Sequence, residues 1–177
     1  SEITEAAMRG ELDFQESLQR RVALLAGLDA SALDRVFEER LRLSMGAEAM
    51  LRTVQAAGLK TLLVSGGFTF FTNRLKQALQ LDYTHANELE IIDGKLTGKV
   101  LGTIVDADEK KRTVERVCAE LGIPTTQAIV MGDGANDLKM MSISGLSVAF
   151  RAKPIVRKQA SLALNFVGLN GALNYLF

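Results

Sequence analysis

The sequence has no tryptophan, two prolines, one cysteine and one histidine in 177 residues. A single cysteine, Cys118, cannot form a disulfide within the chain. It lies on the apolar side of a helical pattern with Val114, Val117 and Leu121, which predicts a buried, unreactive thiol and fits a reducing cytoplasm. The single histidine, His85, has no second histidine with which to form a metal-binding pair, so we assign it a structural or surface role.

An excess of charge of one sign and a long apolar run are also absent. The chain has 21 basic and 21 acidic residues, which excludes the basic excess that nucleic-acid binding requires. No apolar run approaches the roughly 20 residues of a membrane-spanning helix. The acidic start Ser1–Glu5 is unlike the basic start of a signal peptide. With 47% hydrophobic residues, the composition is typical of one globular domain with a sizeable core, and we expect neither nucleic acid nor a membrane as a partner.

Helical patterns occupy the first part of the chain. Apolar residues recur at helical spacing between Glu11 and Leu25, and a second helix begins near Ser31, for which Ser31 is the expected N-cap. The third helix spans Met45–Ala57 and is closed by Gly58. Because no strand pattern occurs before Lys60, we expect a small helical domain at residues 1–43.

From Lys60 onward, strand and helix patterns alternate, which predicts a doubly wound, mainly parallel α/β domain at residues 44–177. One segment departs from this plan, because Asp93-Gly94 between two short strands predicts a type I′ hairpin. The predicted elements, in order, are the strand Lys60–Ser65, the helix Phe71–Leu79, the hairpin strands Leu89–Ile92 and Lys95–Val100, the helix Lys110–Leu121, the strand Ala128–Met131, the helix Asp137–Ile143, the strand Leu146–Phe150, a short helix from Pro154, the strand Leu162–Val167 and the helix Leu169–Phe177.

A glycine-rich acidic segment, Gly132–Asp137, follows the buried strand Ala128–Met131. The glycines permit a tight turn, and Asn136 is the expected N-cap of the next helix. Open α/β sheets bind ligands beyond the carboxyl ends of their strands, where Asp133 and Asp137 would offer oxygen ligands to a hard cation. For either aspartate alone, an ordinary acidic turn is an equally good interpretation. The whole segment favours a metal site.

Two further segments lie at predicted strand ends. Ser65-Gly66-Gly67 combines a hydroxyl with successive glycine amides, which can form a backbone nest for phosphate before a helix N-terminus. A tight turn without a ligand is the alternative. Lys110 and Lys111 open a helix, where a cation opposes the helix dipole, and this suits a bound anion. Solvated surface lysines are the commoner explanation for each one alone. Together, the segments describe a phosphate site with Mg²⁺ beside it.

These residues carry a resemblance to a known family. Val64–Phe68, Lys110 and Gly132–Asp137 resemble the second, third and fourth motifs of haloacid-dehalogenase-type phosphatases. The resemblance implies a Rossmann-like core with a small helical cap and a β-hairpin, and a Mg²⁺-dependent phosphomonoesterase activity. It assigns Asp133 and Asp137 to the metal, with Asp137 supporting the metal or Lys110 from behind. The residues that it would place around the phosphoryl group are Ser65, Gly66, Gly67, Lys110 and Asn136, of which Ser65 and Lys110 would take part in catalysis.

A narrower resemblance, to one group of these phosphatases, runs along almost the whole chain. It implies that Arg21 pairs with a carboxylate of the substrate, since a planar guanidinium matches a carboxylate in bidentate fashion, and that Met8 and Phe14 line the pocket. The expected partner is therefore a small phosphate ester that carries a carboxylate, and a homodimer stays open. The segments that carry this resemblance are Ala7–Phe14, Arg20–Val22, Ala86–Leu89, Asp93–Gly98 and Ala149–Pro154.

The sequence departs from the family at its first motif. That motif, Asp-x-Asp-x-Thr, carries the nucleophile and the acid/base aspartate, and no such string occurs here. Asp106-Ala107-Asp108 is only a superficial match, because it follows no long apolar strand. We expect roughly 35 residues, one strand and one helix, to lie upstream in a longer natural chain. Without that strand, the strands ending at Ser65 and Met131 would face each other with unpaired edges.

Two classes of function therefore stay open. In the first, the intact protein is a phosphatase for a small ester, and residues 1–177 alone are inactive because the nucleophile is absent. In the second, the chain is a fragment or pseudoenzyme that binds Mg²⁺ or phosphate without catalysis. A related phosphatase for another small phosphate ester is a further alternative within the first class.

Overall fold

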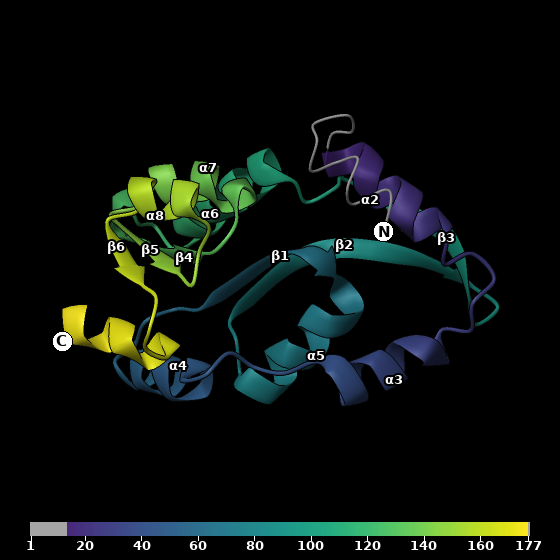
Figure 1. The fold of residues 1–177 in the computed structure, drawn as a ribbon, viewed down its shortest axis with the longest axis horizontal. Coiled ribbons are helices and arrows are strands. Elements are labelled where there is room, and N and C mark those ends of the chain that lie inside the picture. Colours follow the sequence, from purple (N-terminus) through teal and green to yellow (C-terminus); the bar gives the residue numbers. More distant parts are fainter. Residues whose placement is uncertain (1–13, 177) are drawn as a thin grey trace.

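The computed structural model describes residues 14–176, and Met8 lies outside them. Figure 1 shows two groups of strands, each with helices packed against it. In the described part of the chain, three α-helices precede the first strand, at the three predicted places: α2 (Phe14–Ala23), α3 (Ser31–Arg40) and α4 (Ala47–Ala56). Within residues 14–176, no helix combines the length and the apolar character that crossing a membrane requires. The division into domains at residue 43 stays a prediction.

The first sheet has three strands in the order β1 (Leu62–Phe68), β2 (Tyr83–Ile92) and β3 (Lys95–Leu101). β1 and β2 are parallel, joined by α5 (Thr69–Leu79), and β2 and β3 are antiparallel. The turn between them has positive φ at both Asp93 (50°) and Gly94 (74°), so the predicted type I′ hairpin is confirmed. The hairpin and α2 bury a common apolar cluster that includes Leu18, Leu89 and Leu96.

The second sheet is entirely parallel, in the order β4 (Ile129–Gly132), β5 (Leu146–Phe150) and β6 (Leu162–Leu164). Alternate residues of its strands enter two apolar clusters: Val130 and Ala149 lie in one with residues of α6, α7 and α8, while Val148 lies in the other with Ala172. The strands are therefore buried on both faces, as parallel strands usually are. The α-helices of this half are α6 (Ala107–Glu120), α7 (Leu138–Ser142) and α8 (Pro154–Gln159), and the 3-10 helices are η1 (Thr125–Gln127), η2 (Ala135–Asp137) and η3 (Leu169–Tyr175).

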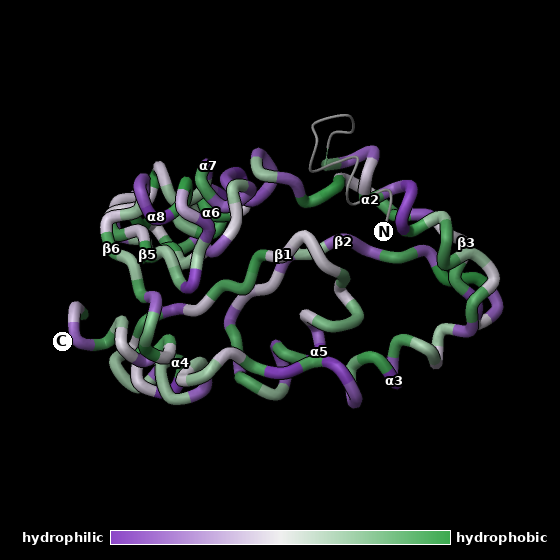
Figure 2. The backbone as a smooth tube through the Cα atoms, in the orientation of Figure 1, coloured by the Kyte–Doolittle hydropathy of each residue, from purple (hydrophilic) through white to green (hydrophobic). Residues whose placement is uncertain are grey.

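The two sheets do not form one continuous sheet. β1 is an edge strand of the first and β4 is an edge strand of the second, and no described strand joins them. Side chains nevertheless connect the halves, because Leu62 and Val64 of β1 pack against the cluster that contains Val130 of β4 and Val114 of α6. In Figure 2 the first part of β1 is coloured hydrophobic and its glycine-rich end is pale. Among the described residues, β1 and β4 therefore each have one edge that pairs with no strand.

Several details of the predicted helices and strands are wrong. Ser31 does not cap α3; its own amide donates to Asp29 Oδ1 at 2.8 Å, because the aspartate two residues earlier offers a charged acceptor. The last strand ends at Leu164 rather than Val167, and the last helix, η3, is of the 3-10 type.

Cys118 is buried, as predicted, and burial raises the pKa of its thiol.

Candidate active site

Two buried charges form the centre of the acidic segment. Lys110 Nζ donates to Asp137 Oδ1 at 2.7 Å, and the two side chains are only 7% and 6% exposed. The second oxygen of this carboxylate, Asp137 Oδ2, accepts from the amides of Asp133 (3.0 Å) and Gly134 (3.1 Å). Asp137 thus joins α6 to the loop after β4. The prediction that Asn136 caps the following helix is wrong, because Asn136 lies inside η2 and the residue that precedes α7 is Asp137.

Gly132 is required by this arrangement. A Cβ atom at position 132 would lie 2.5 Å from the Cβ of Asp137 and 2.6 Å from its Oδ2. No side chain fits between strand β4 and the carboxylate that folds back over it. The glycine therefore serves close approach rather than a left-handed turn, and any larger residue would displace Asp137.

Asp133 differs from Asp137 in that its side chain is exposed. Only its backbone atoms make hydrogen bonds within residues 14–176: the amide donates to Asp137, and the carbonyl accepts from Lys153 at 3.1 Å. No group of three acidic, histidine or cysteine side chains that could enclose a metal occurs in the described part of the chain. Mg²⁺ is commonly bound by one or two carboxylates together with water and substrate oxygens, and the Asp133 carboxylate fits that use.

Asp106 and Asp108 have structural roles in the first turn of α6. Asp106 is the N-cap, and its Oδ1 accepts from the Glu109 amide at 2.9 Å. Burial raises the pKa of Asp106, but hydrogen bonds from the Glu109 amide and the Gln15 carboxamide lower it more, so the net pKa is below its ordinary value. Asp108 pairs with Lys139 at 2.7 Å on the surface. Both carboxylates therefore have partners within the fold, and the assignment of the nucleophile to another segment stays a prediction.

The hydroxyl and glycine segment lies at the end of β1. The strand continues through Gly66 and Gly67 to Phe68, and α5 begins at Thr69, so the glycines lie in the strand just before the helix. The phosphate-binding role of this segment stays a prediction. Ser65 Oγ accepts from the Gly67 amide at 3.0 Å. On the other side of the same peptide, the Gly66 carbonyl accepts from Asn87 Nδ2 at 2.9 Å. The peptide is therefore fixed at both ends.

Asn87 is a residue to which our sequence analysis gave no role. It lies in β2, is 1% exposed, and contacts both the end of β1 and the segment before α6. The sequence contains one signal for it, since asparagine is disfavoured inside strands. Arg151 is a second such residue: it has φ 46° in the loop that reaches the Asp133 carbonyl through Lys153.

The helix α2 brings two of its residues to this site. A Cβ at Gly66 would lie 3.1 Å from Phe14 Cζ, so the phenyl ring lies directly over the glycine. Gln15 Nε2 donates to Asp106 Oδ2 at 2.7 Å. Arg21, seven residues after Phe14 and hence on a similar face of the helix, is exposed and makes no ion pair with a described carboxylate. Its Nε donates to the Ser17 carbonyl at 3.4 Å.

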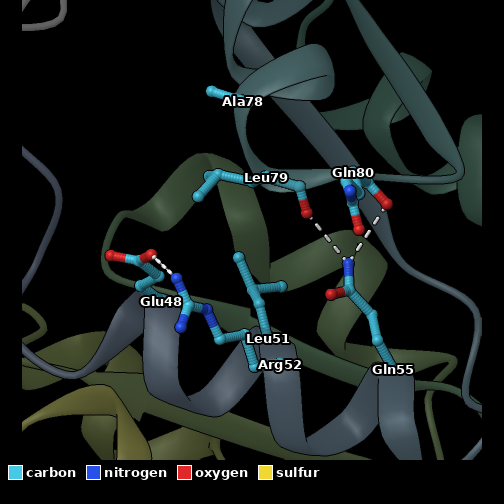
Figure 3. A pocket seen from close by; sticks show the side chains of 7 residues that line it. All are labelled: Glu48, Leu51, Arg52, Gln55, Ala78, Leu79 and Gln80. Atoms are coloured by element: carbon cyan, nitrogen blue, oxygen red, sulfur yellow. Dashed lines mark hydrogen bonds and ion pairs between the residues drawn. The ribbon is translucent and has the colours of Figure 1, made fainter.

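A separate cavity of about 380 Å³ lies between α4 and the end of α5 (Figure 3). Its polar groups are satisfied by one another: Glu48 pairs with Arg52, and Gln55 Nε2 donates to the carbonyls of Leu79 (3.0 Å) and Gln80 (3.1 Å). Gln55 thereby satisfies carbonyls at the C-terminal end of α5. The cavity contains none of the predicted site residues, and we interpret it as a joint between the two helices.

The chain is similar to known proteins in both sequence and fold. Residues 3–142 match the family model for haloacid dehalogenase-like hydrolases. Over 176 residues the chain is 53% identical to a phosphoserine phosphatase of Polaromonas sp.. The aligned region covers 97% of this chain and 75% of that protein. It is 52% identical to a phosphoserine phosphatase of Streptomyces coelicolor, of which it spans only 43%.

The fold is also that of solved structures. A substrate-bound phosphoserine phosphatase complex superposes with a TM-score of 0.90 at 37% identity, covering 98% of this chain and 82% of that one. The predicted α/β fold, with its mainly parallel strands and its helices, is therefore confirmed. Because the chain spans 43% to 75% of the two curated relatives above, a substantial part of each relative has no counterpart in these residues.

Proposed function

The chain belongs to the haloacid dehalogenase-like hydrolase family, and from this premise we propose that it forms most of the catalytic domain of a phosphoserine phosphatase. The reaction is hydrolysis of O-phosphoserine to serine and phosphate, in the service of serine biosynthesis in the cytoplasm. The observation that carries the proposal is the buried Lys110–Asp137 pair, which fixes the loop bearing the exposed Asp133 carboxylate.

In this proposal, one group of residues binds the phosphate anion and a second group binds the Mg²⁺ cation. Ser65 and Gly67 would offer a hydroxyl and an amide to phosphate oxygens in place of the hydrogen bond that they make to each other, and Lys110 would supply positive charge. Asn136 completes the phosphate side. Asp133 would hold Mg²⁺, with Asp137 orienting its loop. When bound, the ion would neutralise charge on the phosphoryl oxygens.

The nucleophile is not among residues 1–177, since they contain no Asp-x-Asp-x-Thr string. We assign it to a strand that lies between β1 and β4, whose facing edges have no strand partner in residues 14–176. A strand in that position would end beside Ser65 and Asp133, because parallel strands present their carboxyl ends at one edge of a sheet. Its aspartate would form an aspartyl-phosphate that water then hydrolyses, which divides one difficult displacement into two easier ones.

Phosphoserine is the substrate that best fits the residues on α2. Its carboxylate would pair with the exposed guanidinium of Arg21, and Phe14 would cover the phosphate loop at Gly66. Met8 stays assigned to the same pocket from the sequence resemblance. The division into a helical cap at residues 1–43 and a core at residues 44–177 belongs to the same proposal.

The test compares residues 1–177 with a longer protein that includes the upstream segment of the natural chain. Phosphate release from O-phosphoserine is measured with Mg²⁺ and with a chelator. We expect turnover only by the longer protein and only with Mg²⁺. Equal turnover by both would place the nucleophile within these residues, and Asp106 and Asp108 would be the first to mutate. Phosphate or Mg²⁺ binding without turnover by either protein would favour the non-catalytic alternative, and turnover of other esters alone would favour a related phosphatase.

A further inference from the structure

We infer that Asn87 is a positioning residue that orients the Gly66–Gly67 peptide of the phosphate site and couples it to the start of the helix that carries Lys110. The inference rests on the proposed function for its catalytic consequence. Its structural part rests on three hydrogen bonds of one buried side chain, which come from both ends of its carboxamide.

The donor end of Asn87 determines which way the peptide faces. Nδ2 donates to the carbonyl of Gly66 at 2.9 Å and to that of Gly67 at 3.2 Å. In a planar trans peptide the C=O and N–H groups point in opposite directions. The Gly66 carbonyl points toward Asn87, so the Gly67 N–H points away from it, and there it meets Ser65 Oγ at 3.0 Å. Asn87 thus orients the Gly67 amide that we assign to the phosphate, and this amide in turn donates to the Ser65 hydroxyl oxygen.

The strand is irregular at this place, which is why it needs such support. Four residue steps of β1, from Val64 to Phe68, face only two steps of β2, from His85 to Asn87. Extra residues in a strand lose their regular ladder partners and must be satisfied otherwise. The Asn87 carboxamide supplies partners to two successive carbonyls there. The irregular part of β1 therefore depends on the Asn87 side chain for its hydrogen bonds.

The acceptor end of Asn87 reaches the other half of the site. Oδ1 accepts from the Val105 amide at 2.8 Å, and Val105 is completely buried. The next residue, Asp106, caps α6, and its carbonyl accepts from the Lys110 amide at 2.9 Å. One carboxamide therefore connects the phosphate peptide to the first turn of the helix whose lysine binds Asp137.

The test uses the full-length protein that contains this chain, with Asn87→Ala and Asn87→Asp. The aspartate keeps the shape but cannot donate to the carbonyls when ionised. We measure kcat and KM for O-phosphoserine and the inhibition constant of inorganic phosphate. We expect the inhibition constant to rise and kcat to fall by at least about tenfold in both variants, since orienting a single donor has effects of that order or larger.

The matched control is Thr61→Val, because Thr61 is also buried and also joins β1 to β2, at the opposite end of the strands. Its hydroxyl donates to Asp82 Oδ2 at 3.0 Å and accepts from the Asp82 amide at 3.1 Å. We expect this variant to unfold more easily while kcat and the inhibition constant change less than about twofold. If Asn87→Ala changes both constants no more than Thr61→Val does, the inference is overturned.

A second measurement separates this inference from the proposed function. Amide NMR spectra of the unmodified protein are recorded with increasing inorganic phosphate, and the shifts of Gly67 are compared with those in Asn87→Ala. If the protein hydrolyses no phosphate ester, the proposed function fails, but phosphate-dependent shifts at Gly67 that the variant loses still support the positioning role. Absence of those shifts in the unmodified protein, or their persistence in the variant, overturns it.

Discussion

The two halves of the candidate site are stabilised in different ways. The acidic half, next to β4, is held by charge: Asp137 binds Lys110 and two amides within four residues of itself. The half at the end of β1 contains no charged side chain, and its orientation depends on a neutral carboxamide from the neighbouring strand, Asn87. A site can therefore combine one half that is held by a buried ion pair with another that is held by a neutral side chain of the neighbouring strand.

This difference also sets how each half should respond to mutation. A buried charge that loses its partner is costly, whereas an exposed carboxylate can be neutralised with little effect on folding. The acidic half contains both cases, in Asp137 and Asp133. Mutations in the half at β1 should mainly change phosphate binding and turnover, and should change the free energy of unfolding less.

The largest effect on stability is expected for Asp137→Asn. The substitution leaves the Lys110 ammonium, on a side chain 7% exposed, without a counter-charge, and removing one partner of a buried pair costs about 3–5 kcal/mol. Phosphatase activity of the longer protein should disappear as well, because the loop amides lose their charged acceptor. Urea unfolding of the longer protein measures the stability change.

The control for this prediction is Asp133→Asn, in which the charge is removed from an exposed side chain. We expect it to unfold within about 0.5 kcal/mol of the unmodified protein, as surface substitutions usually do. Its turnover at limiting Mg²⁺ should nevertheless fall by more than about a hundredfold, since metal-ion stabilisation is worth several kcal/mol. Undiminished turnover of Asp133→Asn would show that Asp133 is not a metal ligand. An unchanged urea-unfolding midpoint for Asp137→Asn would contradict the distinction between the buried and the exposed aspartate.

A smaller and more selective effect is expected for Arg21→Ala in the longer protein. If Arg21 pairs with the substrate carboxylate, the variant should lose about 1.5–3 kcal/mol of binding, roughly ten- to a hundredfold in kcat/KM, with O-phosphoserine. Phosphoethanolamine lacks the carboxylate and should lose little. The neighbouring Arg20 pairs with Glu16 at 2.6 Å and provides the control Arg20→Ala. Equal losses on both esters would mean that Arg21 has a structural role.

The sequence predicted the segment Gly132–Asp137 better than the contacts of Asn87, for a physical reason. The residues of Gly132–Asp137 contact one another within a few positions, so their spacing carries the information. Asn87 and Gly66 are 21 positions apart, and Gln15 and Asp106 are 91 apart. Periodicity indicates on which face of a strand a residue lies, but not which distant group it meets there.

The errors at helix ends have a different cause. Ser31 and Asn136 each have a residue type that suits an N-cap, yet each lies inside a helix, Ser31 at the start of α3 and Asn136 in η2. Nearby aspartates accept backbone amides at these helix starts, and a charged acceptor forms a strong hydrogen bond. At α6 an aspartate, Asp106, is the N-cap, and its position directly before a helical pattern was the available signal for it.

The smallest effect is expected at the contact between α2 and the core. Gln15→Ala removes the hydrogen bond to Asp106 Oδ2. Because this hydrogen bond is exposed to solvent, we expect a loss of about 0.5–1 kcal/mol in the free energy of unfolding. Gln19 lies one turn further along α2 and is exposed, and its side chain has no hydrogen-bond partner among residues 14–176, so Gln19→Ala is the matched control.

The effect of Gln15→Ala should also depend on pH, in a direction that the pKa of Asp106 determines. The folded-state pKa of Asp106 is below its ordinary value, and the Gln15 carboxamide is one of the groups that lower it. A lowered pKa contributes stability that is present above the unfolded-state pKa and is lost as the pH falls through the folded-state pKa. The difference in unfolding free energy between Gln15→Ala and the unmodified protein should therefore be full at pH 7 and shrink below about pH 4. Urea titrations at pH 7 and pH 3 measure it, and a difference that grows toward low pH would show that Gln15 does not act through the Asp106 carboxylate.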